Sequence, residues 1–143
     1  AGLTAETLKE QMAKFLGDQY QTPPMFSAKK VGGVPLYKLA RQGQEVAREP
    51  RFIRVSKFDL LSWENPKAKF ILSCTKGTYV RTLCHDLGKR IGCGARMTAL
   101  RRISSDKFNV AEAVTLDELS QMSPSTIKKI LIPVRSAVPS LAF

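Results

Sequence analysis

The sequence has few residues of the kinds that bind metals or form cross-links. It contains one histidine, His85, and three cysteines, Cys74, Cys84 and Cys93. An odd number of cysteines, all in stretches that resemble protein core, predicts free thiols in a reducing compartment. Their spacing around a single histidine matches no zinc pattern, so the sequence predicts no metal site.

Long apolar runs are also lacking. No stretch approaches the ~20 apolar residues that a membrane-spanning helix needs, and the first residues do not have the basic-then-apolar order of a signal peptide. Both observations predict a cytoplasmic protein with no membrane partner. Of the 143 residues, 43% are hydrophobic and 24% are charged, which excludes a disordered or fibrous chain and predicts one globular domain.

Acidic residues are scarce relative to basic ones. The chain has 23 Lys and Arg against 12 Asp and Glu, a net charge of +11. Residues 29–107 hold 18 of the basic and 6 of the acidic residues, or +12, whereas the two flanks together carry 5 and 6, or −1. A solvated, solubilising surface is the alternative for scattered lysines, but here the basic pairs recur beside aromatic residues and glycines. The middle of the chain is therefore predicted to bind nucleic acid.

The first part of the sequence predicts a helix, a long loop and a short helix. Thr4 is a suitable cap for an amphipathic helix that Gly17 ends. Residues 18–33 contain two adjacent prolines and two adjacent glycines, which predicts a loop without regular structure. A loop of this length inside a compact domain is usually functional. Pro35 begins the short helix. The apolar residues of the first helix are Leu8, Met12, Phe15 and Leu16.

The central part predicts a β-hairpin followed directly by a helix. Residues 51–62 and 68–75 are rich in β-branched, aromatic and leucine residues, and turn-forming residues separate them. Trp63 lies at the rim of this hairpin and is predicted to pack there. From Val80 to Ile91 apolar residues recur at helical spacing, and glycines follow.

The last part predicts short elements. Residues 97–102 alternate in polarity, which predicts a strand. Thr115 and Glu118 form a capping box for a helix that reaches about Met122, and Ser123 with Pro124 begins another. No period is clear in residues 132–143.

The motif KGTYVR, residues 76–81, lies where the hairpin meets the helix N-terminus. Free backbone N–H groups at a helix N-terminus favour anions. It is not a P-loop, because the second glycine and the Gly-Lys-Ser/Thr order are absent. Tyr79 could stack on an unpaired base and Arg81 could pair with a carboxylate or phosphate. From the residues alone, a core Tyr79 with a surface Arg81 is about equally plausible.

Two long motifs resemble those of the TruB-type tRNA pseudouridine synthases. They are QTPPMFSAKKVGGVPLYKLARQG at residues 21–43 and CTKGTYVRTLCHDLGKRIGCGARMTALRR at residues 74–102, in the family's order. The resemblance extends from about residue 3 to residue 108 and weakly to residue 132. It implies an α+β fold with a mixed, largely antiparallel sheet flanked by helices, and the hairpin-to-helix pattern agrees with this fold.

The resemblance also implies an activity. Enzymes of this family isomerise a T-loop uridine of tRNA, at position 55, to pseudouridine after flipping the base into a pocket. They need no cofactor and no metal. Tyr79 looks like the aromatic residue that stacks on the flipped uridine, and it is a candidate for proton transfer at C5. Arg81 looks like the arginine that pairs with the catalytic aspartate. Leu100 looks like an apolar wall of the pocket.

The RNA-binding residues are implied in the same way. Residues 18–43 resemble the family's thumb-like loop with its short helix, and the T arm of tRNA is the expected partner. Its glycines and prolines agree with a segment that becomes ordered on binding. The expected RNA-binding residues are Lys29, Lys30, Tyr37, Arg41, Lys76, Arg101 and Arg102.

One family motif is not found. The nucleophilic aspartate of the family lies in a GTLDP-like motif, and no aspartate of this chain has that context. We therefore expect residues 1–143 to be the C-terminal part of one catalytic domain, without the N-terminal catalytic half and the C-terminal RNA-binding domain, and inactive alone. The N-terminal half is then a second expected partner. The alternative is a non-catalytic RNA-binding module that uses the same basic surface.

Overall fold

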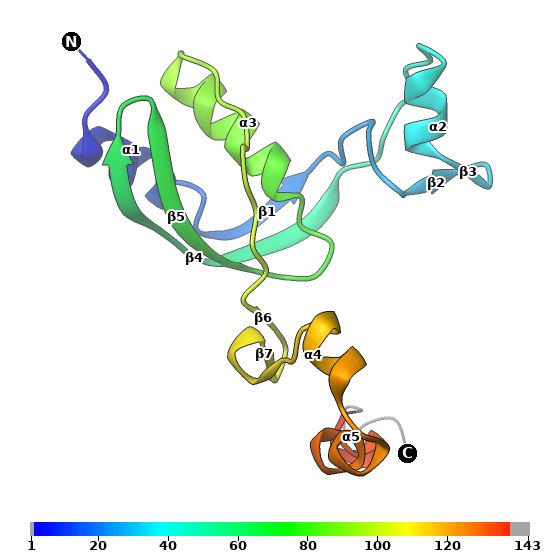
Figure 1. Cartoon of the computed structure of the whole chain (residues 1–143). Helices are drawn as coiled ribbons and strands as arrows, with labels where there is room; N and C mark the ends of the chain where they lie inside the picture. Colours follow the sequence, from blue (N-terminus) through cyan, green and yellow to red (C-terminus); the bar gives the residue numbers. More distant parts are fainter. Residues whose placement is uncertain (1, 138–143) are drawn as a thin grey trace. The chain divides into compact units, whose positions relative to one another are not determined.

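The structure is a computed structural model that describes residues 2–137, and its contacts divide the chain into two compact units between Ala99 and Leu100. The first unit is built on a three-stranded sheet with the strand order β1-β4-β5 (Figure 1). The strands are β1 (Gly17–Gln21), β4 (Arg51–Glu64) and β5 (Lys67–Cys74). Every pairing among the described strands is antiparallel. The predicted α+β class and the predicted hairpin are confirmed.

Two helices cover one face of this sheet. They are α1 (Ala5–Ala13), capped by the Thr4 side chain as predicted, and α3 (Val80–Ile91). Their apolar residues pack with the inward side chains of β4, and Trp63 packs at the edge of this core as expected. Leu16 lies beyond the end of α1 and is exposed, contrary to its predicted place on the apolar face. The buried core residues are Leu8, Met12, Phe15, Ile53, Val55, Phe58, Leu83 and Leu87.

Strand β1 corrects the prediction that residues 18–33 lack regular structure. Its inward positions are Gly17, Gln19 and Gln21, so the strand has no apolar face for a sequence pattern to reveal. Its register is instead set by β4, with Tyr20 opposite Phe52. A strand whose buried side is polar is stable only because backbone hydrogen bonds and a specific partner satisfy it.

Residues 22–50, here called the arm, connect β1 to β4 (Figure 1). The arm contains a two-stranded hairpin, β2 (Lys30–Val31) and β3 (Val34–Pro35), followed by the predicted helix α2 (Leu36–Arg41). Gly32 and Gly33 both have positive φ, the backbone conformation that a two-residue hairpin turn requires. Leu36 is fully buried, and its N–H donates to the Lys29 carbonyl at 2.7 Å.

The second unit consists of short elements. The capping box of Thr115 and Glu118 is confirmed, and the Thr115 N–H lowers the pKa of Glu118 by hydrogen bonding to its carboxylate. The elements are β6 (Ser104–Ser105), β7 (Phe108–Asn109), a 3-10 turn η1 (Val110–Glu112), α4 (Leu116–Gln121), α5 (Pro124–Ile130) and α6 (Val134–Ala137). Every side chain described in residues 100–137 is at least partly exposed, so this unit has no core of its own there.

Two further expectations are wrong. Residues 97–102 form no strand, because no other described segment pairs with them. Only Cys84 is buried, which raises the pKa of its thiol, whereas Cys74 and Cys93 are exposed. Cys74 ends β5 and Cys93 lies between two glycines after α3, so neither faces the core.

Candidate nucleic-acid interface

The candidate site is formed at the N-terminus of α3. Strand β5 ends at Cys74, Gly77 adopts a positive φ, and Tyr79 is the N-cap residue of the helix. A strand thus passes into a helix within five residues, which places Tyr79 and Arg81 at the end of the sheet. The Tyr79 side chain is half-buried and Arg81 is exposed. Both are positioned where the sequence predicts an anion-favouring helix start.

The buried side chain of Gln21 holds the backbone of Tyr79 from both sides. The Tyr79 N–H donates to Gln21 Oε1 at 2.7 Å, and Gln21 Nε2 donates to the Tyr79 carbonyl at 3.1 Å. Gln21 is only 5% exposed. A buried side-chain amide that is hydrogen-bonded through both its oxygen and its nitrogen has one orientation. Gln21 therefore fixes the position of the Tyr79 backbone, from which the aromatic side chain extends.

Arg81 makes a second connection between α3 and the chain beyond β1. Its Nη2 donates to the Phe26 carbonyl at 2.7 Å. Gln21 and Phe26 bracket the two prolines at the start of the arm, so the first turn of α3 is bonded to both sides of that turn-rich stretch. None of the three ion pairs formed by the described residues includes Arg81.

The remaining predicted residues fall in two places. Lys29, Lys30, Tyr37 and Arg41 all lie in the arm, where the Arg41 guanidinium lies 5.5 Å from the centre of the Tyr37 ring. Lys76 lies in the loop before Tyr79. Leu100, Arg101 and Arg102 lie in the second unit and are exposed. A contact between Leu100 and Tyr79 stays a prediction.

Gln21 and Phe26 were missed by sequence reasoning. A lone glutamine before a proline pair carries no chemical signal, and Phe26 acts through its carbonyl, which every residue has. Only the pairing of β1 with β4 brings Gln21 to α3, across 58 positions of sequence.

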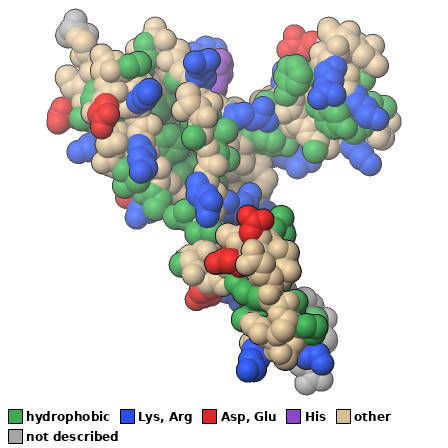
Figure 2. Space-filling view, in the orientation of Figure 1, with side chains coloured by type: hydrophobic (Ala, Val, Ile, Leu, Met, Phe, Trp, Pro, Cys, Tyr) green, Lys and Arg blue, Asp and Glu red, His purple; other side chains and the backbone are tan. Residues whose placement is uncertain are grey.

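Basic side chains are spread over the visible face of the first unit. Figure 2 shows blue Lys and Arg side chains over the body of the first unit and over its arm, with few red acidic ones between them. Among the described residues, no three His, Cys, Asp or Glu side chains are grouped as a metal site would need. No helix in the described part of the chain is long and apolar enough to cross a membrane.

Removal of the Gln21 amide is expected to loosen Tyr79 without unfolding the protein. Gln21→Leu leaves the Tyr79 N–H and carbonyl without their partners, so the Tyr79 amide hydrogen should exchange with solvent at least about tenfold faster, the equivalent of about 1.4 kcal/mol. Gln21→Glu keeps the acceptor for the Tyr79 N–H but places an oxygen against the Tyr79 carbonyl, so it should restore only part of the protection. Hydrogen exchange followed by NMR measures this, and equal protection in Gln21→Leu would contradict it.

Comparison with known proteins places these features in a family. The description "TruB family pseudouridylate synthase (N terminal domain)" matches residues 1–80, and "tRNA pseudouridylate synthase B C-terminal domain" matches residues 81–139. A curated relative named tRNA pseudouridine synthase B from Opitutus terrae is 59% identical over 138 residues, which is 96% of this chain and 57% of the relative. One of the same name from Syntrophotalea carbinolica is 47% identical and is covered to 46%.

The fold also has a solved counterpart. A chain in the crystal structure of a Cbf5-Nop10-Gar1 complex superposes with a TM-score of 0.66 at 28% identity, covering 83% of this chain and 31% of that chain. The chain spans about half the length of the curated relatives it matches. The similarity extends over both units, because the two family descriptions together reach from residue 1 to residue 139.

Proposed function

This chain belongs to the TruB family of pseudouridylate synthases, and from that premise we propose that it supplies the RNA-binding and pocket residues of a tRNA pseudouridine synthase. The proposed reaction converts a T-loop uridine, at tRNA position 55, to pseudouridine after the base has flipped out of the loop. The observation that carries the proposal is the first turn of α3, where buried Gln21 holds Tyr79 and Arg81 lies two residues further on.

Tyr79 is the proposed platform for the flipped base. Extruding a base costs a few kcal/mol, and stacking on an aromatic ring returns about 1–3 kcal/mol. Because Gln21 already fixes the Tyr79 backbone, only the two side-chain torsions of Tyr79 remain to be ordered when the base arrives. In this position the Tyr79 hydroxyl is also the candidate group for proton transfer at C5 of the uracil.

Arg81 is the proposed partner of the catalytic carboxylate. A guanidinium beside a carboxylate favours its ionised form and orients it through two parallel hydrogen bonds. In this chain the Arg81 guanidinium binds the Phe26 carbonyl at the surface. We propose that the nucleophilic aspartate comes from a part of the enzyme outside these 143 residues, because no aspartate here lies in a GTLDP-like motif.

The basic residues of the chain are the proposed contacts to the T arm. Arm residues Lys29, Lys30, Tyr37 and Arg41 can reach phosphates and unpaired bases, and Lys76 lies beside the pocket residue Tyr79. Arg101 and Arg102 are proposed to contribute from the second unit, next to the pocket residue Leu100. Phosphate contacts of this kind position the RNA without reading its sequence.

Tritium release from C5 of a labelled T-arm stem-loop tests the proposed function. The chain alone should bind the stem-loop and release no tritium. A chimera that carries this chain in place of the matching region of the Opitutus terrae enzyme, 59% identical, should release tritium. Turnover by the chain alone would contradict the proposed absence of the nucleophile. A folded chimera that binds RNA without turnover would instead favour the non-catalytic RNA-binding module.

A further inference from the structure

An open groove of about 420 Å³ lies beside the candidate site. It runs between the start of β4 and the loop that follows β5, and its lining residues are Arg51, Phe52, Ile53, Lys76 and Gly77. Two of its lining residues, Lys76 and Gly77, belong to the loop that leads into Tyr79, the proposed platform of the flipped uridine. Its volume falls in the range of small-ligand sites.

The groove contains an aromatic side chain that the fold does not use. Phe52 is 59% exposed, although it lies within the region where β1 pairs with β4. Its ring forms a T-shaped pair with the Tyr20 ring, with ring centres 5.9 Å apart and planes at 77°, and Tyr20 is itself 74% exposed. Two large apolar rings that remain in solvent mark a surface for binding.

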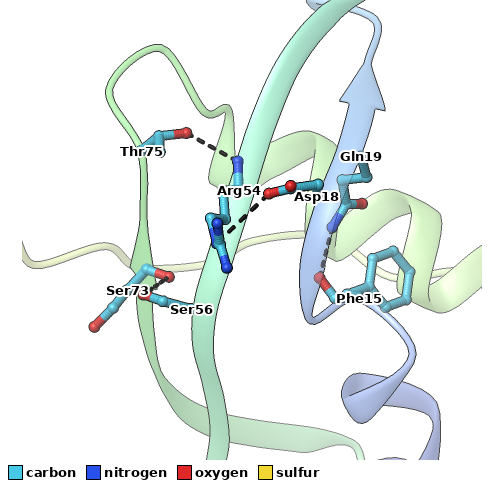
Figure 3. A network of polar contacts seen from close by, with 7 residues as sticks. All are labelled: Phe15, Asp18, Gln19, Arg54, Ser56, Ser73 and Thr75. Carbon is cyan, nitrogen blue, oxygen red and sulfur yellow. Dashed lines mark hydrogen bonds and ion pairs between the residues drawn. The ribbon is translucent and has the colours of Figure 1, made fainter.

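The wall opposite Phe52 is held rigidly. Figure 3 shows the Thr75 hydroxyl beside the backbone of Arg54. The Arg54 N–H donates to Thr75 Oγ1 at 3.0 Å, and the Thr75 N–H donates to the Arg54 carbonyl at 2.9 Å. This pair fixes the residue before Lys76 against β4, so the width of the groove is set by backbone contacts.

The charged side chains around the groove are mostly basic, and some of them form no ion pair with the described residues. Arg54 forms an ion pair with Asp18 at 3.5 Å (Figure 3), whereas Arg51 and Lys76 take part in none of the ion pairs formed by residues 2–137. Both side chains are exposed. A groove lined by both an exposed aromatic residue and exposed cations is suited to a base with its phosphate.

We infer that this groove binds one unpaired nucleotide of the RNA next to the flipped uridine, with its base on Phe52 and its phosphate at Arg51 and Lys76. The inference rests on the proposed function, since it assumes an RNA substrate. An apolar protein partner would gain nothing from the two cations, and a free phosphate would gain nothing from the ring. Because every base has a π-face, stacking on Phe52 should tolerate any base.

Binding of a fluorescent T-arm stem-loop to the chain, measured across a salt series, tests the inference. Phe52→Ala should weaken binding roughly tenfold with an unchanged salt dependence, because stacking carries no charge. Phe52→Trp should retain full affinity. Lys76→Gln should lower the slope of log K against log salt by about one, as expected for one lost phosphate contact.

Two controls separate the groove from general effects. Leu61→Ala removes a side chain that is 58% exposed on the same strand, and it should bind the stem-loop like the unsubstituted chain. A fully paired RNA duplex offers no free base, so Phe52→Ala should not alter its binding. If Phe52→Ala matches Leu61→Ala, or weakens duplex and stem-loop equally, the inference is wrong while the proposed function stands. If the unsubstituted chain binds no stem-loop, both are overturned.

Discussion

Replacing Arg81 by alanine in the catalytically competent chimera is expected to lower the rate of tritium release by at least about 100-fold. Arg81 is the proposed partner of the nucleophilic carboxylate, and a misplacement of about 1 Å at a reacting group costs about 10²-fold in rate. Its loss also removes the bond to the Phe26 carbonyl at 2.7 Å. The rate at saturating RNA separates these effects, because it reports on the chemistry after binding.

Two further variants test whether the loss of rate is specific to the Arg81 guanidinium. Arg81→Lys keeps the charge but not the two-pronged geometry, so its rate should recover only in part. Arg90→Ala removes an arginine from the last turn of the same helix, where it binds Gln11 at 3.2 Å, and should leave the rate within about threefold of the parent. An Arg81→Ala chimera with the parental rate at saturating RNA would exclude Arg81 from the chemistry.

Gly88→Ala is expected to destabilise the first unit by about 2 kcal/mol, within the usual range for overpacking. A Cβ atom at this position would clash with the Ala95 nitrogen and the Gly94 carbonyl carbon. Both are backbone atoms, so no flexible side chain can move aside. Alanine favours the helix by at most ~1 kcal/mol over glycine, which is too little to offset the clash.

Urea unfolding followed by circular dichroism measures this change. Lys89→Ala, at the neighbouring exposed position of α3, is the control and should shift the free energy of unfolding by less than about 0.5 kcal/mol. The Gly94 N–H donates to the Gly88 carbonyl at 3.0 Å, so the substitution should also expose residues 92–96 to faster hydrogen exchange. A Gly88→Ala protein as stable as the parent would contradict the close packing.

Local chemistry explains which elements the sequence predicts well. Helices α1, α3 and α4 each combine a helical apolar or capping pattern with a defined end, and all three form as expected. The hairpin of β4 and β5 has a clear turn between two apolar runs. Strand β1 was missed because its inward face is polar. Residues 97–102 were wrongly predicted as a strand, because they have the alternation of one but no described partner.

The residues of the candidate site also fall into those that a local motif identifies and those that only the fold reveals. Tyr79 and Arg81 were predicted because the motif KGTYVR identifies them, and the structure places both at the first turn of α3. Gln21, Phe26 and the groove at Phe52 were not predicted, since each depends on a neighbour distant in sequence. The roles of Leu100 as a pocket wall and of Arg101 and Arg102 as RNA-binding residues stay predictions.

The sequence by itself determined the charge, the family and the residue types of the site. Side-chain identity and spacing are written in the chain, so a basic central segment and two long motifs needed no coordinates to be recognised. Only the tertiary structure decided that a buried glutamine holds Tyr79 and that the exposed Phe52 lines one groove with Arg51 and Lys76. These facts depend on strand register, which backbone pairing sets between segments that no local pattern connects.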